Sequence, residues 1–347
     1  MDRGVPARAV IGAGGWGTAL ALLLARRGPV TLLARTEADA AAIAALRVNE
    51  RHLPGIVLPP EVVVTADPGA LNGAVELVVM AVPSRYVRET ARRVAPFVPA
   101  GTALLSVTKG LETGTLLRMS EVLGEEIVAV RGRIAALSGP NLAPEIARGL
   151  PASSVVGCPD EAVGAAIVSL LGSRTFRLYT NRDIVGVELA GALKNIIAIA
   201  AGAVDRLGYG DSGKAAIVTR GLAEMTRLGV AAGANPLTFA GLAGVGDVLA
   251  TCASPLSRNH RLGMELASGR RWSEIEAALP GVAEGAYTVD AAIALAARLG
   301  VELPIAQEVH RALFEDKPVE RCLADLLARE SKAELAGLEG WGSAAGS

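Results

Sequence analysis

Short runs of apolar residues alternate with helix-length segments through the first half of the chain. The apolar runs at residues 9–11, 30–34, 77–83, 103–108, 134–137, 153–156 and 175–179 predict strands. The segments 18–27, 37–46, 86–94 and 161–171 between them predict helices. Strands that are apolar throughout and separated by helices indicate a parallel sheet covered on both faces. We therefore expect an α/β fold that begins with a Rossmann-type domain.

After about Thr180 the pattern becomes helical only. Residues 184–204, 214–228, 258–267, 287–299 and 305–314 have helical length, and Gly or Pro residues separate them. The expected organisation is a dinucleotide-binding Rossmann-type domain over residues 1–182 and an all-α, substrate-binding C-terminal domain over 183–335. The small-residue-rich segment 336–347 is expected to be a frayed tail.

Composition and charge narrow the class of protein. A chain of 347 residues fits two domains, and 51% hydrophobic with 20% charged residues is typical of a globular protein. The formal net charge of −1 provides no field that would attract nucleic acid or anionic lipid. Any recognition of an anion must therefore be local.

Neither a metal nor a membrane segment is expected. The three cysteines and three histidines are scattered without a ligand pattern, so we expect neither a metal site nor a disulfide framework. The absence of a disulfide pattern predicts a cytoplasmic location. The N-terminus has no signal-peptide pattern. The longest apolar run, residues 196–204, is about half of what a bilayer span needs, so we expect a soluble protein without a transmembrane segment.

A Gly-x-Gly-x-x-Gly motif stands where the first strand meets the first helix. Gly12 permits a tight turn, Gly14 lets the backbone approach a pyrophosphate, and Gly17 lets the helix pack on the strand. In a chain with 40 glycines the motif alone is weak, and a glycine-rich turn without a ligand is the alternative. Its position at the first strand–helix junction favours a dinucleotide site.

The residue after the second strand bears on the choice of cofactor. NAD enzymes have an acidic residue there for the ribose 2′-hydroxyl, whereas this chain has Arg35 followed by Thr36. A guanidinium suits a 2′-phosphate, so NADPH is preferred over NADH. The nearby acidic Glu37 means that NADH stays an alternative cofactor. Arg35 could also lie free in solvent without contacting a cofactor.

Lys194 is the only charged residue between Glu188 and Asp205, in a helix that is apolar on nearly every face. Such a helix is expected to be buried, and burial lowers the pKa of an ammonium toward the range useful for proton transfer. Reduction of a ketone needs a proton for the developing alkoxide, which a lysine can supply. The alternative is a lysine that reaches the surface from a core helix.

Two polar clusters follow in the helical half. Asp247 and Thr251 are four residues apart and share one helical face, although Asp247 could simply be an N-cap. The second cluster, Ser257, Arg258 and Asn259, is expected in or near the first turn of a helix. Free N–H groups and a guanidinium there suit a phosphate. The alternative is a polar first turn that is simply solvated. A P-loop-like stretch at 208–214 is rejected because it lacks the final Ser/Thr and follows a helix.

These pieces, in this order, resemble the bacterial-type NAD(P)-dependent glycerol-3-phosphate dehydrogenase family along nearly the whole chain. The matching segments are 12–19, 106–112, 138–143, 188–195, 246–252, 257–259 and 282–285. The ordered set spans both predicted domains, whereas the glycine motif alone would not discriminate. Asn141 departs from the pattern, because the family more often has a small hydroxyl residue there.

The resemblance implies an oxidoreductase that interconverts dihydroxyacetone phosphate and sn-glycerol 3-phosphate with NAD(P)H and supplies glycerophospholipid biosynthesis. It implies Lys194 as general acid/base, with Asp247 holding its charge and orientation. The substrate contacts it implies are Lys109, Gly139, Asn141, Lys194, Asn195, Asp247, Thr251, Ser257, Arg258 and Asn259. The cofactor contacts are Gly12, Gly14, Gly15, Trp16, Gly17, Arg35, Lys109, Ala143, Arg258, Val282 and Glu284.

Two other functions stay open at this stage. One is another two-domain dehydrogenase, acting on a hydroxy acid or a sugar phosphate, which should lack the polar turn at 257–259. The other is a non-catalytic nucleotide-sensing protein on the same fold, which would have no reason to bury Lys194 near Asp247. Homo-oligomers are common among such enzymes, so a homodimer is open, and no interface signature is visible in the sequence.

Overall fold

The computed structural model describes residues 7–73, 75–278 and 281–330, and the expected frayed tail at 336–347 lies outside them. The main sheet within these ranges has eight strands in the order β10-β9-β8-β7-β6-β1-β2-β5. They are β1 (Ala7–Ile11), β2 (Val30–Leu33), β5 (Val62–Thr65), β6 (Val75–Met80), β7 (Ala103–Ser106), β8 (Ile134–Ser138), β9 (Ala152–Gly157) and β10 (Phe176–Asn181). All seven strands expected from the apolar runs are therefore confirmed.

Helices cover both faces of this sheet, because successive strand residues point to opposite sides. Val10 packs in one apolar cluster with residues of α1 (Gly15–Ala25) and α6 (Glu161–Leu171). Its neighbour Ile11 packs in another with α3 (Val87–Val94) and α4 (Met119–Glu126). The remaining helices of this part are α2 (Glu37–Leu46) and the short α5 (Ala143–Ala147).

The strand order creates a ligand site at one edge of the sheet. From β5 through β2, β1, β6 and β7 to β8, every neighbouring pair is parallel, in the order of a doubly wound Rossmann sheet. The winding reverses between β1 and β6. Ligands of such sheets bind beyond the carboxyl ends of the strands at this point.

The prediction of a parallel sheet is wrong at β9, which pairs with β8 in the antiparallel direction. A parallel crossover usually returns through a helix long enough to run back along the sheet. Between β8 and β9 the only α-helix is α5, with five residues, so the chain enters β9 from the same edge at which β8 ends. The last strand, β10, is parallel to β9.

The pattern of apolar residues also missed a small hairpin and an edge strand. The hairpin pairs β3 (Val48–Asn49) with β4 (Leu53–Val57), and β5 closes one edge of the main sheet. Pro54 and Gly55 within β4 are typical of a loop, and β5 is only four residues long.

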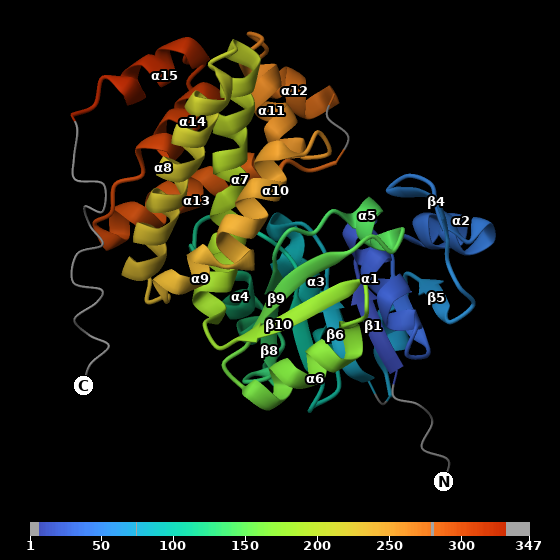
Figure 1. The fold of residues 1–347 in the computed structure, drawn as a ribbon. Helices are drawn as coiled ribbons and strands as arrows, with labels where there is room; N and C mark the ends of the chain where they lie inside the picture. The colour runs from blue at the N-terminus through green and yellow to red at the C-terminus, as the bar shows by residue number, and fades with distance from the viewer. Residues whose placement is uncertain (1–6, 74, 279–280, 331–347) are drawn as a thin grey trace, which may run out of the picture.

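The second part of the structure is helical. It comprises α7 (Ile184–Leu207), α8 (Gly210–Ala231), α9 (Pro236–Ala240), α10 (Asp247–Ala253), α11 (Arg258–Leu266), α12 (Trp272–Ala278), α13 (Glu284–Leu299), α14 (Pro304–Phe314) and α15 (Val319–Leu327). Figure 1 shows these helices, coloured from yellow-green to red, gathered beside the blue-to-green sheet part. The five helices expected from the sequence are present, and the short α9, α12 and α15 were not anticipated.

Helix α7 is the centre of the helical part. The Asp183 side chain caps its start by accepting the Gly186 N–H, and Gly208 ends it in the left-handed conformation at φ 72°. The helix has 24 residues, and an 18-residue window within it has a mean hydropathy of 1.7, so by length and composition it could cross a membrane. The apolar run at 196–204 therefore underestimates the length of the apolar segment. Because 89% of the 18-residue window is buried inside the protein, α7 is a core helix.

A buried carboxylate attaches α7 to the sheet part. Glu188 accepts hydrogen bonds from Arg118 Nη1 at 2.6 Å, from the Ser120 N–H at 2.8 Å and from Ser120 Oγ at 2.5 Å. Burial raises the pKa of Glu188, and the charge of Arg118 opposes that rise. The first turns of α7, just before Lys194, are therefore held against the start of α4.

Candidate active site

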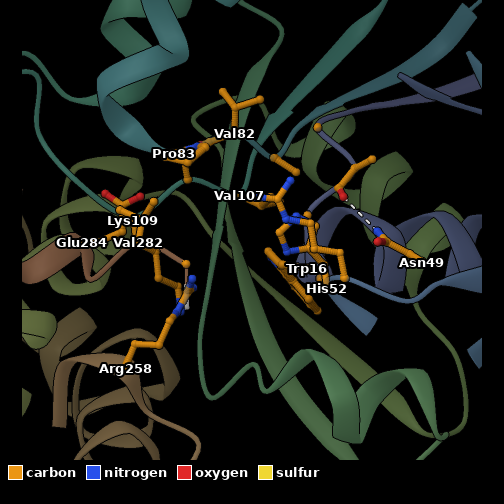
Figure 2. Close-up of a pocket in the computed structure, with 18 of the residues that line it drawn as sticks. Trp16, Asn49, His52, Val82, Pro83, Val107, Lys109, Arg258, Val282 and Glu284 are labelled. Atoms are coloured by element: carbon orange, nitrogen blue, oxygen red, sulfur yellow. Dashed lines mark hydrogen bonds between the residues drawn. The ribbon is translucent and has the colours of Figure 1, made fainter. Parts of the chain in front are cut away.

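A pocket of about 780 Å³ lies between the carboxyl edge of the sheet and the helical part. Its volume is in the range of small-molecule and cofactor sites. Most of the predicted site residues line it, and these are Gly12, Gly14, Gly15, Trp16, Arg35, Lys109, Asn141, Lys194, Asn195, Asp247, Thr251, Ser257, Arg258, Asn259, Val282 and Glu284. Gly17, Gly139 and Ala143 do not line it. In Figure 2, Arg258, Val282 and Glu284 lie on one side of this pocket and Trp16, Asn49 and His52 on the other.

The glycine loop has the geometry that a dinucleotide needs. Gly12 has φ +109°, and a Cβ there would lie 2.5 Å from the Ala81 carbonyl oxygen. A Cβ at Gly17 would collide with the carbonyl of Gly12, so Gly17 serves helix–strand packing. Gly14 faces open space and caps α1 without any side-chain hydrogen bond. The first N–H groups of α1 are thus available to a pyrophosphate, so the residues present fit a nicotinamide dinucleotide.

The β3–β4 hairpin is a part of the site that sequence reasoning missed. Asn49 Nδ2 donates to the Ala13 carbonyl at 2.9 Å and to Thr18 Oγ1 at 2.8 Å, which attaches the hairpin to the glycine loop. A Cβ at Gly15 would lie 2.7 Å from the His52 carbonyl oxygen, so only glycine allows this approach. Burial, and then the charge of Arg51, lower the pKa of His52. Nothing in the local sequence pattern marked this segment as part of the pocket.

Arg35 lies where the sequence predicts, directly after β2 and on the pocket wall. The next residue, Thr36, caps α2 by accepting the Asp39 N–H at 3.1 Å. Asp39 and Glu50 are acidic residues on the pocket wall, and Glu37 does not line it.

The centre of the pocket holds a carboxylate between two lysines. Lys194 Nζ donates to Asp247 Oδ1 at 2.7 Å and to Thr251 Oγ1 at 2.5 Å. Lys109 Nζ donates to Asp247 Oδ2 and, at 3.0 Å, to the Gly139 carbonyl. Lys194 is only 7% exposed, so it does not reach the surface from a core helix. Asp247 is the first residue of α10 and not its N-cap, which is Gly246.

The charges in this cluster shift the pKa values of its members. Burial would raise the pKa of Asp247, yet Lys109 and Lys194 hold it below its usual value. Burial lowers the pKa of Lys109 to about 8, and the charge of Asp247 opposes this. Two ammonium groups and one carboxylate leave a net positive site, which suits an anionic substrate or a developing alkoxide.

The polar turn at the start of α11 faces the same pocket. Ser257 caps this helix by accepting the His260 N–H at 3.2 Å. Asn259 Nδ2 donates to Asn195 Oδ1 at 2.8 Å, and Asn259 Oδ1 accepts the Gly285 N–H at 3.0 Å. Asn259 thus joins α7, α11 and α13, whereas the Arg258 side chain extends toward the pocket in Figure 2. Arg258 adds a guanidinium to the pocket wall beside this turn.

The residues after β8 lie next to the pocket, and Asn141 lines it. Gly139, at φ +143°, supplies the carbonyl that Lys109 contacts, and it is backbone rather than side chain that acts there. Asn141 Oδ1 accepts from Ser154 Oγ, while its buried Nδ2 has no hydrogen-bond partner among the described residues. Ala143 begins α5 behind the glycine loop, 4.0 Å from where a Gly15 Cβ would be.

The site contains no built metal centre. In the described ranges no group of three or more His, Cys, Asp or Glu side chains could hold an ion.

Comparisons with known proteins agree with this arrangement. Sequence models described as the N-terminus and the C-terminus of NAD-dependent glycerol-3-phosphate dehydrogenase match residues 8–164 and 183–324. A glycerol-3-phosphate dehydrogenase [NAD(P)+] of Moorella thermoacetica is 47% identical over 94% of this chain and 97% of its own length. One from Streptomyces coelicolor is 45% identical, with 94% and 97% covered.

A solved structure extends the likeness to three dimensions. The crystal structure of glycerol-3-phosphate dehydrogenase from Coxiella burnetii superposes with a TM-score of 0.89 at 37% identity, covering 93% of this chain and 99% of that one. A ketopantoate reductase from Ralstonia eutropha, at 20% identity and a TM-score of 0.56, shares the fold alone. The matches to both family models and to the Moorella thermoacetica relative favour this family over the first of the two open alternatives. With both halves matched and the lysine–aspartate cluster in one pocket, the chain belongs to the NAD-dependent glycerol-3-phosphate dehydrogenase family.

Proposed function

We propose that the protein interconverts dihydroxyacetone phosphate and sn-glycerol 3-phosphate with NADPH or NADH. One observation carries this proposal, which is that the Lys194–Asp247–Lys109 cluster faces a pocket with a dinucleotide loop on one side and Arg258 on the other. The relatives with glycerol-3-phosphate dehydrogenase names support the choice of substrate. We further propose that the reaction supplies glycerol 3-phosphate for glycerophospholipid synthesis in the cytoplasm.

The reaction needs a hydride and a proton. When bound, the reduced nicotinamide supplies the hydride to the carbonyl carbon of the ketone. Lys194 Nζ donates the proton to the carbonyl oxygen as negative charge develops on it. Asp247 and Thr251 hold that nitrogen in place at 2.7 Å and 2.5 Å, and its buried position excludes water from the transfer.

The other side chains bind and orient. Lys109 adds a second positive charge beside the reacting oxygen, and Arg258 holds the phosphate at the start of α11. The N–H groups of α1 would bind the pyrophosphate, and Arg35 would contact a 2′-phosphate, which favours NADPH. Glu284 and Val282 would contact the cofactor from the helical side, with Glu284 held by Ser84 Oγ at 2.7 Å.

We also propose that the two parts of the protein bind different ligands, the cofactor and the substrate. The last strand of the sheet ends at Asn181 and α7 begins at Ile184. A boundary between residues 182 and 183 would separate the nucleotide-binding part from the substrate-binding part. A homodimer is the oligomeric state we propose to test by light scattering.

The direct test is oxidation of NADPH by the purified protein, followed by the absorbance of the reduced nicotinamide. Dihydroxyacetone phosphate, unphosphorylated dihydroxyacetone and NADH are assayed in parallel. Rapid oxidation is expected with the phosphorylated ketone and not with unphosphorylated dihydroxyacetone. Arg35→Ala should lower the ratio of the oxidation rate with NADPH to the rate with NADH. Intact NADPH binding with no turnover would instead favour a nucleotide sensor.

The site of phosphate recognition makes a separate prediction. Arg258→Ala should raise the KM for dihydroxyacetone phosphate by about 10- to 100-fold, because a charge-assisted contact contributes about 1.5–3 kcal/mol. Steady-state kinetics with the ketone varied at saturating NADPH measures this. An unchanged KM would place the phosphate elsewhere in the pocket.

The lowered pKa of Lys109 predicts how activity depends on pH. Its ordinary pKa of 10.5 falls to about 8 in the folded protein, so the cation is present below pH 8 and lost above it. The kcat/KM for dihydroxyacetone phosphate should therefore decline above about pH 8, as the free enzyme loses this charge. Lys109→Arg keeps its charge at all these pH values and should remove the decline. The same decline in that variant would assign it to another group.

A further inference from the structure

One contact between the two parts of the protein is not explained by the proposed chemistry. The short helix η2 (Ser84–Tyr86) follows β6, at the edge of the sheet where the cofactor pocket lies. The guanidinium of Arg85 lies 4.8 Å from the ring centre of Tyr86, its neighbour in η2. It also lies 4.6 Å from the ring centre of Tyr287, which belongs to α13 in the helical part. Arg85 thus contacts one ring from each of the two parts of the protein.

The ring of Tyr287 is itself held in place. Trp272 of α12 meets it edge-on, with ring centres 6.1 Å apart and planes at 76°. The Tyr287 hydroxyl donates to Glu276, which also lies in α12. The Tyr287 ring that Arg85 contacts is therefore held in place by its neighbours in α12.

A second contact joins the same two elements closer to the pocket. Ser84 Oγ donates to Glu284 Oε2 at 2.7 Å, and the Ser84 N–H donates to Oε1 at 3.4 Å. A Cβ on Gly110, the residue after Lys109, would lie 2.7 Å from Ser84 Cβ, so the junction is tightly packed. Glu284 is on the pocket wall, and Arg85 and Tyr86 are as well. The Arg85–Tyr287 contact and the Ser84–Glu284 hydrogen bonds therefore both join η2 to α13 at this edge of the pocket.

We propose that Arg85 is a positioning residue, a clasp that joins the two sides of the pocket through Tyr287 and sets the rate at which the nicotinamide cofactor leaves. The proposal rests on the proposed function in one respect, that the cofactor occupies this pocket. Arg85 itself is exposed, so its replacement removes no core packing. Tyr287 is not among the residues that line the pocket, so an effect of Tyr287 on cofactor release has to pass through η2 or α13.

The test is the dissociation rate of NADPH, measured by stopped-flow displacement with excess NADP⁺. Arg85→Ala and Tyr287→Ala should each speed dissociation by about 3- to 10-fold, in line with the strength of such cation–π contacts. The double variant should be no faster than the faster single variant, because both changes remove the same contact. The KM for NADPH should rise while kcat does not fall.

Two control variants make the result specific. Tyr287→Phe keeps the ring that Arg85 contacts and loses only the hydroxyl bond to Glu276, so it should speed dissociation less than Tyr287→Ala does. Arg177→Ala breaks a similar pair, since the Arg177 guanidinium lies 5.4 Å from the ring centre of Tyr179 within β10. That pair does not join the two parts, so its loss should leave the rate unchanged.

The outcomes distinguish this proposal from the proposed function. If Tyr287→Ala leaves the dissociation rate unchanged, Arg85 acts alone and the clasp is wrong. If the two effects simply add, the residues act independently of each other, and the clasp is equally wrong. If the unchanged protein does not bind NADPH at all, the proposed function fails first. Hydrogen exchange of the nucleotide-free protein provides a separate readout, because Tyr287→Ala should speed exchange in η2, on the opposite side of the contact. Unchanged exchange there would equally overturn the clasp.

Discussion

Replacing Lys194 with alanine is expected to reduce kcat by at least about 1,000-fold while leaving NADPH affinity nearly intact. A positioned general acid contributes about 10²–10⁴-fold, and stabilisation of the developing alkoxide adds to it. The buried Nζ of Lys194 donates to both Asp247 and Thr251, and no other described residue donates to both. Asp247 keeps Lys109 as a partner in the variant, so the carboxylate is not left without a counter-charge. Single-turnover kinetics and fluorescence titration with NADPH measure the two quantities separately.

Lys214→Ala is the matched control for this experiment. Lys214 also donates to an aspartate in the helical part, with its Nζ 2.6 Å from Asp205 Oδ2, but it does not line the pocket. Its replacement should leave kcat near that of the unchanged protein. A Lys194→Ala variant that retained most of its kcat would remove Lys194 from the acid role. Lys109 would then be the next candidate, because it contacts the other oxygen of the same carboxylate.

Asp247→Asn should lower both activity and stability, because it removes the carboxylate that lies between the ammonium groups of Lys109 and Lys194. Breaking a buried ion pair by removing one partner costs about 3–5 kcal/mol. The charge of Asp247 is what opposes the lowering of the Lys109 pKa by burial, so that pKa should fall further below 8 in the variant. We expect kcat to fall by about 100-fold or more, with a melting temperature several degrees lower. Turnover assays and differential scanning calorimetry measure the two effects.

Asp205→Asn provides the comparison for Asp247→Asn. Asp205 also lies between two basic side chains, Lys214 and His260, but it is partly exposed and outside the pocket. Its substitution should cost less stability and leave kcat unchanged, because an exposed pair is screened by solvent. Equal losses in the two variants would mean that the Asp247 effect is general destabilisation and not a property of the active site.

Much of the site could be predicted from local sequence because its parts depend on residues close together in the chain. The positive φ at Gly12 and the close packing at Gly17 require glycine at these two positions of the strand–helix turn. The burial of Lys194 follows from the apolar surroundings of its helix, and the face shared by Asp247 and Thr251 follows from helical periodicity. The roles carried by the family resemblance, such as that of Arg258, remain predictions until they are measured.

The sequence by itself determined the alternation of strands and helices, the dinucleotide loop and the presence of a lysine in a buried helix, since each depends on interactions within a few residues. Only the tertiary structure decided that Lys109 and Lys194 share the carboxylate of Asp247, which is 138 and 53 positions away from them. It also decided that β9 runs antiparallel and that the β3–β4 hairpin packs on the glycine loop. Contacts between distant residues arise when the sheet and the helices pack against each other, and local periodicity carries no record of that packing.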